Sequence, residues 1–347
     1  MAAVVGNDDL RRPGGSAVEV LAVAACYYGS ARLGLLRELT VEGAVVSPIW
    51  PPTGVAVAAL LILGLRCWPG ITIGAFFAVL AVNTPRIDVL GTLAGQTLAP
   101  VCAALLLRRA RFRTDLSRLR DGIVLVFLGA LPAMLISATT GAGLLVLMHR
   151  LNAHSFWPAW LAWWVGDAMG VLLITPLLLL LHNARWPPSP ARWKEATALA
   201  VVTCAVVPVA VYSSISVLFL VYPLIIWAAL RFQLAGSVLC ALATSVLATV
   251  AATDDAGAFT GLSRIEIMVK LQAFNGAMAL TALLLSALIT EQRNTRRSVE
   301  KACQELVEVL EHLNAGAAPP PRTEPGHSVG PDGMGGGPGP PSPGGVP

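Results

Sequence analysis

The stretch IWPPTGVAVAALLILGLRCWPGITIGAFFAVL, residues 49–80, starts with a tryptophan and two prolines and continues as an almost purely apolar run. Proline lacks an amide hydrogen, and it is well placed in the first turn of a helix because amides there have no partner within the helix. Tryptophan is enriched at the level of the lipid headgroups. We therefore expect Trp50 to anchor the chain at a membrane surface, and Pro51 and Pro52 to begin a membrane helix.

The composition of the whole chain favours the same environment. The 347 residues are 55% hydrophobic and 13% charged, whereas soluble chains are about 25% charged. The apolar residues form long blocks, many of them near the ~20 residues that cross a bilayer as a helix. No stretch alternates evenly between apolar and polar residues, as the strands of a membrane barrel do. The sequence predicts an all-α fold, a polytopic transmembrane helical bundle solvated by lipid.

Ten apolar segments can be distinguished. They cover residues 16–37, 50–65, 68–82, 89–107, 122–148, 161–181, 195–212, 215–230, 234–252 and 269–290. The second and third are short, so eight full spans plus a short hairpin remain an alternative to ten spans. The integral membrane domain would then cover residues 16–290.

Basic residues favour the cytoplasmic ends of membrane helices, and arginines cluster in three places. The loop at 108–121 holds six arginines, loop 182–194 holds three basic residues, and three arginines lie between residues 293 and 297. Ten crossings place all three on one side. We therefore expect residues 1–15 and the C-terminal end to be cytoplasmic, in a multi-pass protein of the cell membrane. Binding of anionic lipid is another interpretation of the arginine loop.

Tryptophan–proline pairs recur along the chain. They are Trp50-Pro51, Trp68-Pro69, Trp157-Pro158 and Trp186-Pro187. Each falls at a predicted membrane interface, where tryptophan is favoured.

Asp167 is the most unusual polar residue of the apolar blocks. It lies in WWVGDAMG, residues 163–170, about one and a half turns into the predicted sixth span. An ionisable group in a span costs about 2.5–3.5 kcal/mol, which favours a functional role or a buried partner over a wet position near the surface. Gly166 and Gly170 form a small-xxx-small pattern that permits close helix approach. Gln96, in the fourth span, is explained adequately by hydrogen bonding between helices.

The C-terminal part divides into a helical segment and a tail. Residues 291–314 are charged but helix-friendly, and Val299, Cys303, Leu306, Leu310 and Leu313 are spaced by alternating four- and three-residue steps. That spacing predicts a cytoplasmic coiled-coil stalk over 291–313 that forms a homodimer, or a single amphipathic helix on the membrane surface. Residues 315–347 are rich in proline and glycine and are predicted to be disordered.

Several function classes lack support in the sequence. A net charge of +4 offers no general attraction for nucleic acid. The six cysteines show no metal-ligand spacing. No phosphate loop, zinc-protease motif, nucleophile elbow or kinase motif is present. We expect no enzyme activity, no catalytic or metal-binding residues and no cofactor.

Three segments carry a resemblance to a known family. Residues 49–80, WWVGDAMGVLLITPLLLL (163–180) and YPLIIWAALRFQLAG (222–236) resemble the type-one membrane-associated sensor domain, the MASE family, in order over roughly residues 17–290. The resemblance implies a bacterial sensory module of the cytoplasmic membrane. Such modules usually precede a histidine kinase, a diguanylate cyclase or phosphodiesterase, or a serine phosphatase. Residues 291–347 leave no room for such an enzyme, so we expect a separate kinase, cyclase or phosphatase partner or a remnant of a longer sensor.

The predicted function is signal transduction, in a two-component or cyclic-di-GMP context, from an unknown signal in or near the membrane to a cytoplasmic partner. The candidate residues for signal binding are Trp50, Pro51, Pro52, Gly54, Gln96, Trp163, Trp164, Gly166, Asp167 and Gly170. The alternative is a transporter or permease-like protein, because broken helices and a carboxylate at membrane depth also suit that class.

Overall fold

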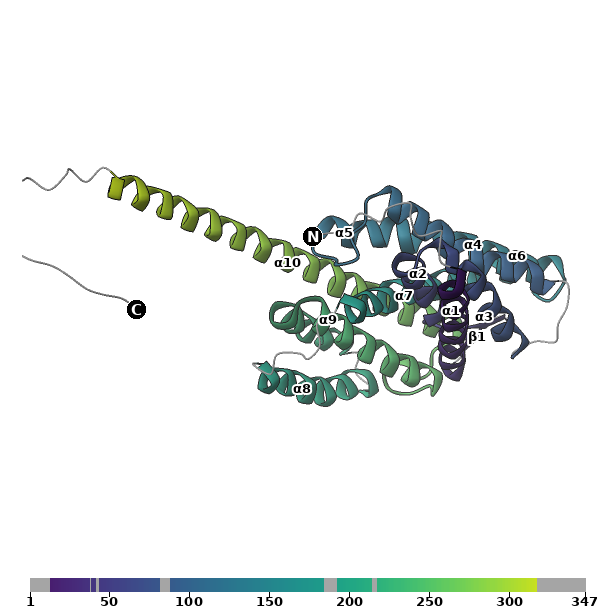
Figure 1. The fold of residues 1–347 in the computed structure, drawn as a ribbon. Helices are drawn as coiled ribbons and strands as arrows, with labels where there is room; N and C mark the ends of the chain where they lie inside the picture. Colours follow the sequence, from purple (N-terminus) through teal and green to yellow (C-terminus); the bar gives the residue numbers. More distant parts are fainter. Residues whose placement is uncertain are drawn as a thin grey trace, which may run out of the picture. The chain divides into compact units, whose positions relative to one another are not determined.

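A computed structural model describes residues 13–37, 39–41, 44–81, 88–183, 192–213 and 217–316. The elements are α1 (Pro13–Gly34), η2 (Leu35–Arg37), β1 (Leu39–Val41), β2 (Ala44–Val46), α2 (Pro51–Ile62), η3 (Leu65–Cys67), α3 (Trp68–Leu80), α4 (Asp88–Arg109), α5 (Leu119–Val124), η4 (Leu125–Ala130), α6 (Leu131–Leu147), η5 (Ala153–Ser155), α7 (Phe156–Asn183), α8 (Trp193–Tyr212), η7 (Leu218–Leu220), α9 (Val221–Thr253), η8 (Gly257–Phe259) and α10 (Arg264–Gly316) (Figure 1). The chain forms two units, Met1–Arg296 and Arg297–Pro347.

The first unit is a helical bundle with one short antiparallel hairpin. Strands β1 and β2 pair Leu39 with Val46 and Val41 with Ala44. The hairpin contacts α7. The expected helical fold is confirmed. The β-hairpin was not expected, because its residues were predicted to form a loop.

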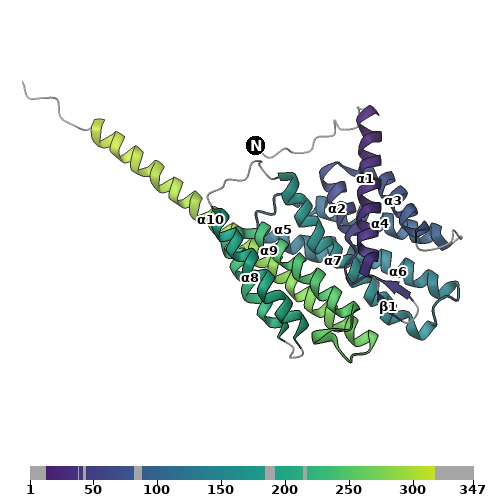
Figure 2. The same ribbon diagram turned by 90° about the horizontal axis from the view of Figure 1, so that it is seen from below.

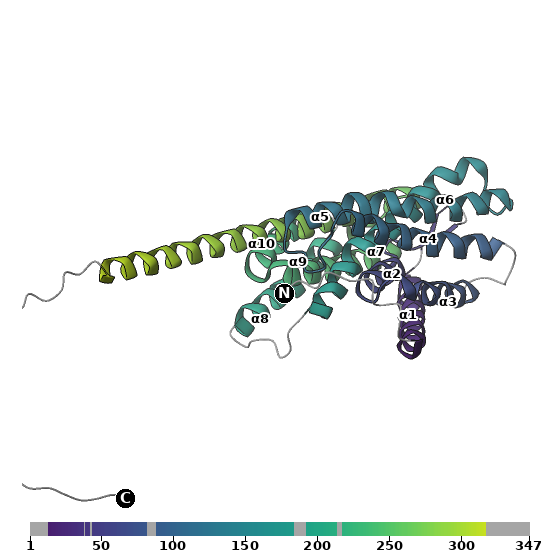
Figure 3. The ribbon, with the colours of Figure 1, turned by 45° about the horizontal axis from the view of Figure 1, so that its top comes forward.

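Helix α7 lies in the middle of this unit. It packs against α2, α6 and α9, and Figure 2 shows α1 to α4 on one side of it and α8, α9 and the first part of α10 on the other. Helices α4 and α6 run side by side (Figure 3), with Gly91 against Leu144 and Gly95 against Thr140. Two apolar cores result, one around α1 to α4 and a larger one around α7, α9 and α10.

Six helical stretches are long and apolar enough to cross a membrane. They are Val89–Arg109, Leu119–Leu147, Ala153–Asn183, Trp193–Tyr212, Leu218–Thr253 and Arg264–Leu313. Pro51–Ile62 and Leu65–Leu80 are apolar but shorter. The 12 residues of α2 reach only about 18 Å at 1.5 Å per residue. Helix length thus supports six spans within the described residues, fewer than the expected ten.

Helix α9 contains a reversal that helix length alone does not show. Gln233 has φ 56° and ψ −140°, outside the helical region. A β-carbon on Gly236 would lie 3.1 Å from the carbonyl oxygen of Ala228, although eight residues of continuous helix would separate them by about 12 Å. The chain therefore turns back at Gln233, and residues 221–232 and 234–253 form two antiparallel helices.

The predicted span 122–148 is built from three parts instead of one helix. Helix α5 leads into the π-helical segment η4, which continues directly into α6. Pro132 is at the start of α6 and cannot donate a backbone hydrogen bond. π-helical segments are rare, and they often occur at functional sites.

Large apolar side chains remain exposed around the outside of the bundle. Phe77, Leu90, Phe127, Val201 and Phe219 are each more than half exposed. A water-soluble surface rarely carries so much apolar area, whereas hydrocarbon chains solvate it at no cost. The outside of the bundle thus has the character of a lipid-facing surface.

Several predictions fall outside the described residues. They concern residues 1–12, Trp186-Pro187 in the segment 184–191, and most of the proline- and glycine-rich tail, 317–347.

Candidate functional site

Asp167 is fully buried in the middle of α7. It lies eleven residues after Phe156, where α7 begins, so it is about three turns into the helix and deeper than the sequence indicated. Its Oδ2 accepts a hydrogen bond from the hydroxyl of Ser137 on α6. Its Oδ1 is buried and has no hydrogen-bond partner among the described residues. The carboxyl group is thus half satisfied.

A non-helical backbone segment lies against α7 beside Asp167. The amide of Trp50, which precedes α2, donates to the carbonyl oxygen of Gly166 at 2.9 Å. The hydroxyl of Thr53 donates to the carbonyl oxygen of Asp167 at 3.0 Å, and the hydroxyl of Thr175 donates to that of Gly54 at 3.0 Å. Non-helical backbone at membrane depth is tolerated where protein satisfies its polar groups. Helix α7 does so here.

Three glycines make this close approach possible. A β-carbon on Gly166 would collide with the carbonyl oxygen of Ser47, and one on Gly170 with the carbonyl oxygen of Trp50. A β-carbon on Gly54 would collide with the carbonyl oxygen of Gly170. The spacing of Gly166 and Gly170 therefore serves contact with a non-helical segment and the start of α2.

Pro51 and Pro52 are in the first turn of α2, as the sequence predicted. Trp50 is bonded into the bundle, which the sequence did not predict. Its backbone is bonded to α7, and its ring lies against Gly34. Backbone contacts between segments that are distant in the sequence fix this position, so the local sequence does not predict it.

The other tryptophan–proline pairs differ from the first. Trp68 is 50% exposed and Trp157 is 68% exposed. Both side chains are free to contact lipid, and their interfacial role stays a prediction.

Gln96 lies near this cluster and has a partner. Its Oε1 accepts a hydrogen bond from the Tyr27 hydroxyl at 3.2 Å, and both residues are buried. The Tyr27 hydroxyl lies beside the Trp50 indole. The expected interhelical hydrogen bond of Gln96 is therefore present, between α4 and α1.

Trp163 and Trp164 join α7 to α6. The Trp163 ring fills the space beside Gly141, 2.7 Å from where a β-carbon would be. The Trp164 Nε1 donates to the carbonyl oxygen of Leu131 at 2.7 Å. Asp167 and Trp164 are three residues apart, so both side chains lie on the face of α7 that contacts α6.

Sequence reasoning missed Tyr27, Ser137, Thr53 and Thr175. Serine and threonine in membrane helices commonly donate to the carbonyl four residues earlier, so their presence alone carried no signal. A phenol in the first span is equally unremarkable. Only the fold shows that they meet Asp167, the start of α2 and Gln96.

Asp167 offers a buried acceptor atom without a hydrogen-bond partner among the described residues. Among the described residues no group of three His, Cys, Asp or Glu side chains could hold a metal ion. Among the described residues, the surroundings of Asp167 therefore offer hydrogen-bonding groups and one carboxylate.

Comparison with known proteins agrees with the sequence resemblance. The family model MASE1 matches residues 20–293. No curated protein and no solved structure matches the chain significantly. The match includes the site and every helix from α2 to α9, and the outward apolar surface and long apolar helices are those of a multi-pass membrane protein. The chain belongs to the MASE1 family of membrane-associated sensor domains.

Proposed function

We propose that this protein is a sensory module that receives a signal at the Asp167 site and passes it through α10 to a cytoplasmic partner. The observation that carries the proposal is the half-satisfied, fully buried carboxyl group of Asp167 beside non-helical backbone. Unpaired polar groups are costly inside a membrane protein. A protein keeps a buried polar group without a partner where a bound ligand or another conformation supplies the missing hydrogen bond.

The unpaired carboxylate oxygen defines the chemistry of the signal. Oδ1 of Asp167 needs a hydrogen-bond donor or a proton. A small molecule with a hydroxyl group supplies such a donor. Reorganisation of the Ser137–Asp167 hydrogen bond would follow directly, because the ligand and Ser137 share the same carboxyl group.

Contacts between helix ends support ten traversals of the membrane. One face of the bundle holds the pairs Arg108–Leu60, Asn183–Thr114, Leu119–Glu291, Arg231–Glu195 and Arg293–Leu230. The opposite face holds Arg37–Asp254, Gly257 against Tyr212, and Lys270–Ala258. With the reversal at Gln233, the chain alternates between these faces from α1 to α10. Short α2 and α3 are consecutive helices in this path, and both pack against α1.

The face with the arginine loop is proposed to be cytoplasmic. Six arginines lie between residues 108 and 121 on that face, and the positive-inside rule places such loops in the cytoplasm. The starting end of α1, where Arg66 pairs with Glu19, and the point where α10 passes Glu291 lie on the same face. Both chain termini are then cytoplasmic.

The C-terminal part of α10 offers the surface for output. Val299, Leu306, Leu310 and Leu313 are each more than half exposed. Their heptad spacing suits a parallel homodimer. A kinase, cyclase or phosphatase that recognises the paired helices would complete the signalling route.

A fusion reporter tests the function. A kinase domain whose activity depends on helix geometry is joined after residue 316. The test variant is Asp167→Asn. The control variant is Asp255→Asn, which changes an exposed carboxylate on the opposite face. We expect Asp167→Asn alone to change kinase activity several-fold. Equal activity of wild type and both variants would contradict the proposal.

The transporter alternative draws on the same unpaired carboxylate and broken backbone. Asp167-dependent solute uptake into proteoliposomes, together with a silent reporter, would favour it over the sensor.

A further inference from the structure

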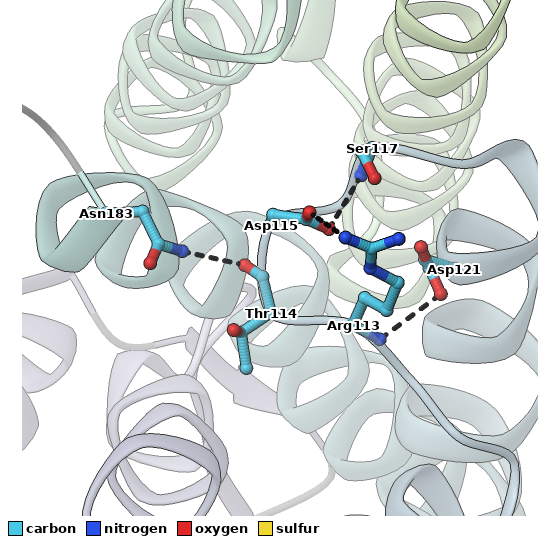
Figure 4. A network of polar contacts seen from close by, with 6 residues as sticks. All are labelled: Arg113, Thr114, Asp115, Ser117, Asp121 and Asn183. Atoms are coloured by element: carbon cyan, nitrogen blue, oxygen red, sulfur yellow. Dashed lines mark hydrogen bonds and ion pairs between the residues drawn. The ribbon is translucent and has the colours of Figure 1, made fainter. Parts of the chain in front are cut away.

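The arginine loop is an ordered structure on the face where α10 leaves the bundle. Asp115 accepts hydrogen bonds from the Arg113 guanidinium at 2.9 Å and from the Ser117 amide at 3.2 Å, and Asp121 accepts from the Arg113 amide at 3.2 Å (Figure 4). Arg111 has φ 54° and Leu116 has φ 49°, both in the left-handed region. The carboxylates thus hold the loop in one specific conformation.

This loop is bound to the end of the helix that carries the site. The Asn183 side chain donates to the carbonyl oxygen of Thr114 at 3.0 Å (Figure 4). Asn183 is the last residue of α7, the helix that contains Asp167. The loop and α7 therefore share a contact on the arginine-rich face.

The loop is also bound to α10. A carboxylate oxygen of Glu291 accepts a hydrogen bond from the backbone amide of Leu119, the first residue of α5, at 2.9 Å. The first amides of a helix have no partner within it, and a carboxylate there also complements the helix dipole. Glu291 thus caps α5 from another helix.

Helix packing strengthens this connection. A β-carbon on Gly122 of α5 would lie 3.5 Å from both Ala287 and Leu284 of α10. The surfaces of α5 and α10 are therefore already in contact one turn from the Glu291 cap. A shift of α5 displaces both contacts together.

The other end of the same rod reaches the site. Helix α5 continues through the π-helical segment η4 into α6, which carries Ser137. Three hydrogen bonds join α6 to α7 there. Trp164 donates to the carbonyl of Leu131, Trp160 donates to the hydroxyl of Thr139, and the Ser137 hydroxyl donates to Asp167. The π-helical residues Leu125–Ala130 thus lie between these contacts and the Glu291 cap.

We infer that the rod α5–η4–α6 is the regulatory link of the sensor, and that Glu291 is the residue through which it acts on α10. This inference rests on the proposed function. When a ligand takes the Asp167 carboxylate from Ser137, α6 loses one of its three hydrogen bonds to α7. The π-helical segment accommodates the shift, because its wider turn can convert to α-helix and change the length and rotation of the rod. The amide of Leu119 then moves relative to Glu291.

A double-mutant cycle tests this link in the full-length protein in lipid nanodiscs. Hydrogen exchange over residues 285–296 is measured for wild type, Ser137→Ala, Glu291→Ala and the double variant. We expect Ser137→Ala to change the exchange rate there by about five-fold, the lower limit of typical coupling between sites. In the Glu291→Ala background the same change should alter the rate less than about two-fold.

Two further variants serve as controls. Glu291→Gln retains an acceptor oxygen, and we expect it to keep most of the response. Thr197→Ala changes an exposed hydroxyl on α8 that bonds only within its own helix, and we expect no response over residues 285–296.

Two results would overturn the inference. The first is an unchanged exchange rate over 285–296 in Ser137→Ala, with altered exchange near residue 137. The second is a Ser137→Ala response of full size in both Glu291 variants. Neither result depends on the fusion reporter, so loss of the link and loss of the sensory function are separately observable.

Discussion

The carbonyl oxygen of Trp50 occupies the space that a β-carbon on Gly170 would need. Segment 47–50 is held there by the Trp50 amide on Gly166 and by the Thr53 hydroxyl on Asp167. The backbone approach around Asp167 therefore depends on the absence of a side chain at residue 170.

Gly170→Ala is expected to displace segment 47–50 and destabilise the protein by about 1–3 kcal/mol, the usual cost of overpacking. Thermal unfolding in detergent measures the change. Gly143→Ala is the matched control, since a β-carbon there would meet nothing within 4 Å. Equal melting temperatures of the two variants would contradict the close packing.

Asp167→Asn is expected to leave stability unchanged or to raise it, because the amide keeps an acceptor oxygen for the Ser137 hydroxyl and carries no charge that burial would penalise. We expect the melting temperature to fall by no more than about 3 °C, which corresponds to about 1 kcal/mol. A large loss of stability, with an unchanged reporter, would show that the carboxylate has a structural role.

Trp164→Phe removes the donor that binds the carbonyl oxygen of Leu131 while keeping an aromatic ring. The expected loss is about 0.6–1.7 kcal/mol, the range measured for hydrogen bonds between membrane helices. Trp157→Phe, at a 68% exposed position, should change unfolding little. A smaller effect at residue 164 than at residue 157 would count against the hydrogen bond.

Sidedness is testable with single cysteines in a cysteine-free background. Asp115→Cys and Thr295→Cys should react with a membrane-impermeant thiol reagent from the cytoplasmic side only. Asp255→Cys should react from the other side, because neighbouring Asp254 pairs with Arg37 on the opposite face. Labelling of residues 115 and 295 from different sides would exclude the ten-pass path.

Oxidation of membranes that contain the full-length protein should cross-link two copies through Cys303. This exposed thiol lies in the apolar seam between Val299 and Leu306. Cys303→Ser should abolish the product, and Leu306→Glu should lower its yield about ten-fold, equivalent to ~1.4 kcal/mol. Cross-linking unaffected by Leu306→Glu would exclude the seam as the dimer contact.

The membrane class and Asp167 were predictable because both stand out locally. A carboxylate in an apolar block and glycines four residues apart need no knowledge of the fold. Ser137 and Thr53 carried no comparable signal, since hydroxyls are common in membrane helices. Their importance comes from contacts across the bundle.

The division into spans shows a second limit of sequence reasoning. Gln233 turns the chain in one residue without the glycine or proline that usually marks a turn. Residues 215–230 and 234–252 were nevertheless predicted as separate segments, and the reversal lies between them. In contrast, the π-helical segment before Pro132 is invisible in apolar periodicity, because every residue of Leu125–Ala130 is small or apolar.

The bonds between segment 47–53 and α7 also constrain how the protein is made. The Thr53 hydroxyl donates to a carbonyl 114 residues further along the chain, and the Trp50 amide likewise finds its acceptor in α7. When α2 leaves the ribosome, neither acceptor has been synthesised. Helix α2 can therefore reach its final position only after α7 has been synthesised, so this part of the bundle is completed well after α2 itself is made.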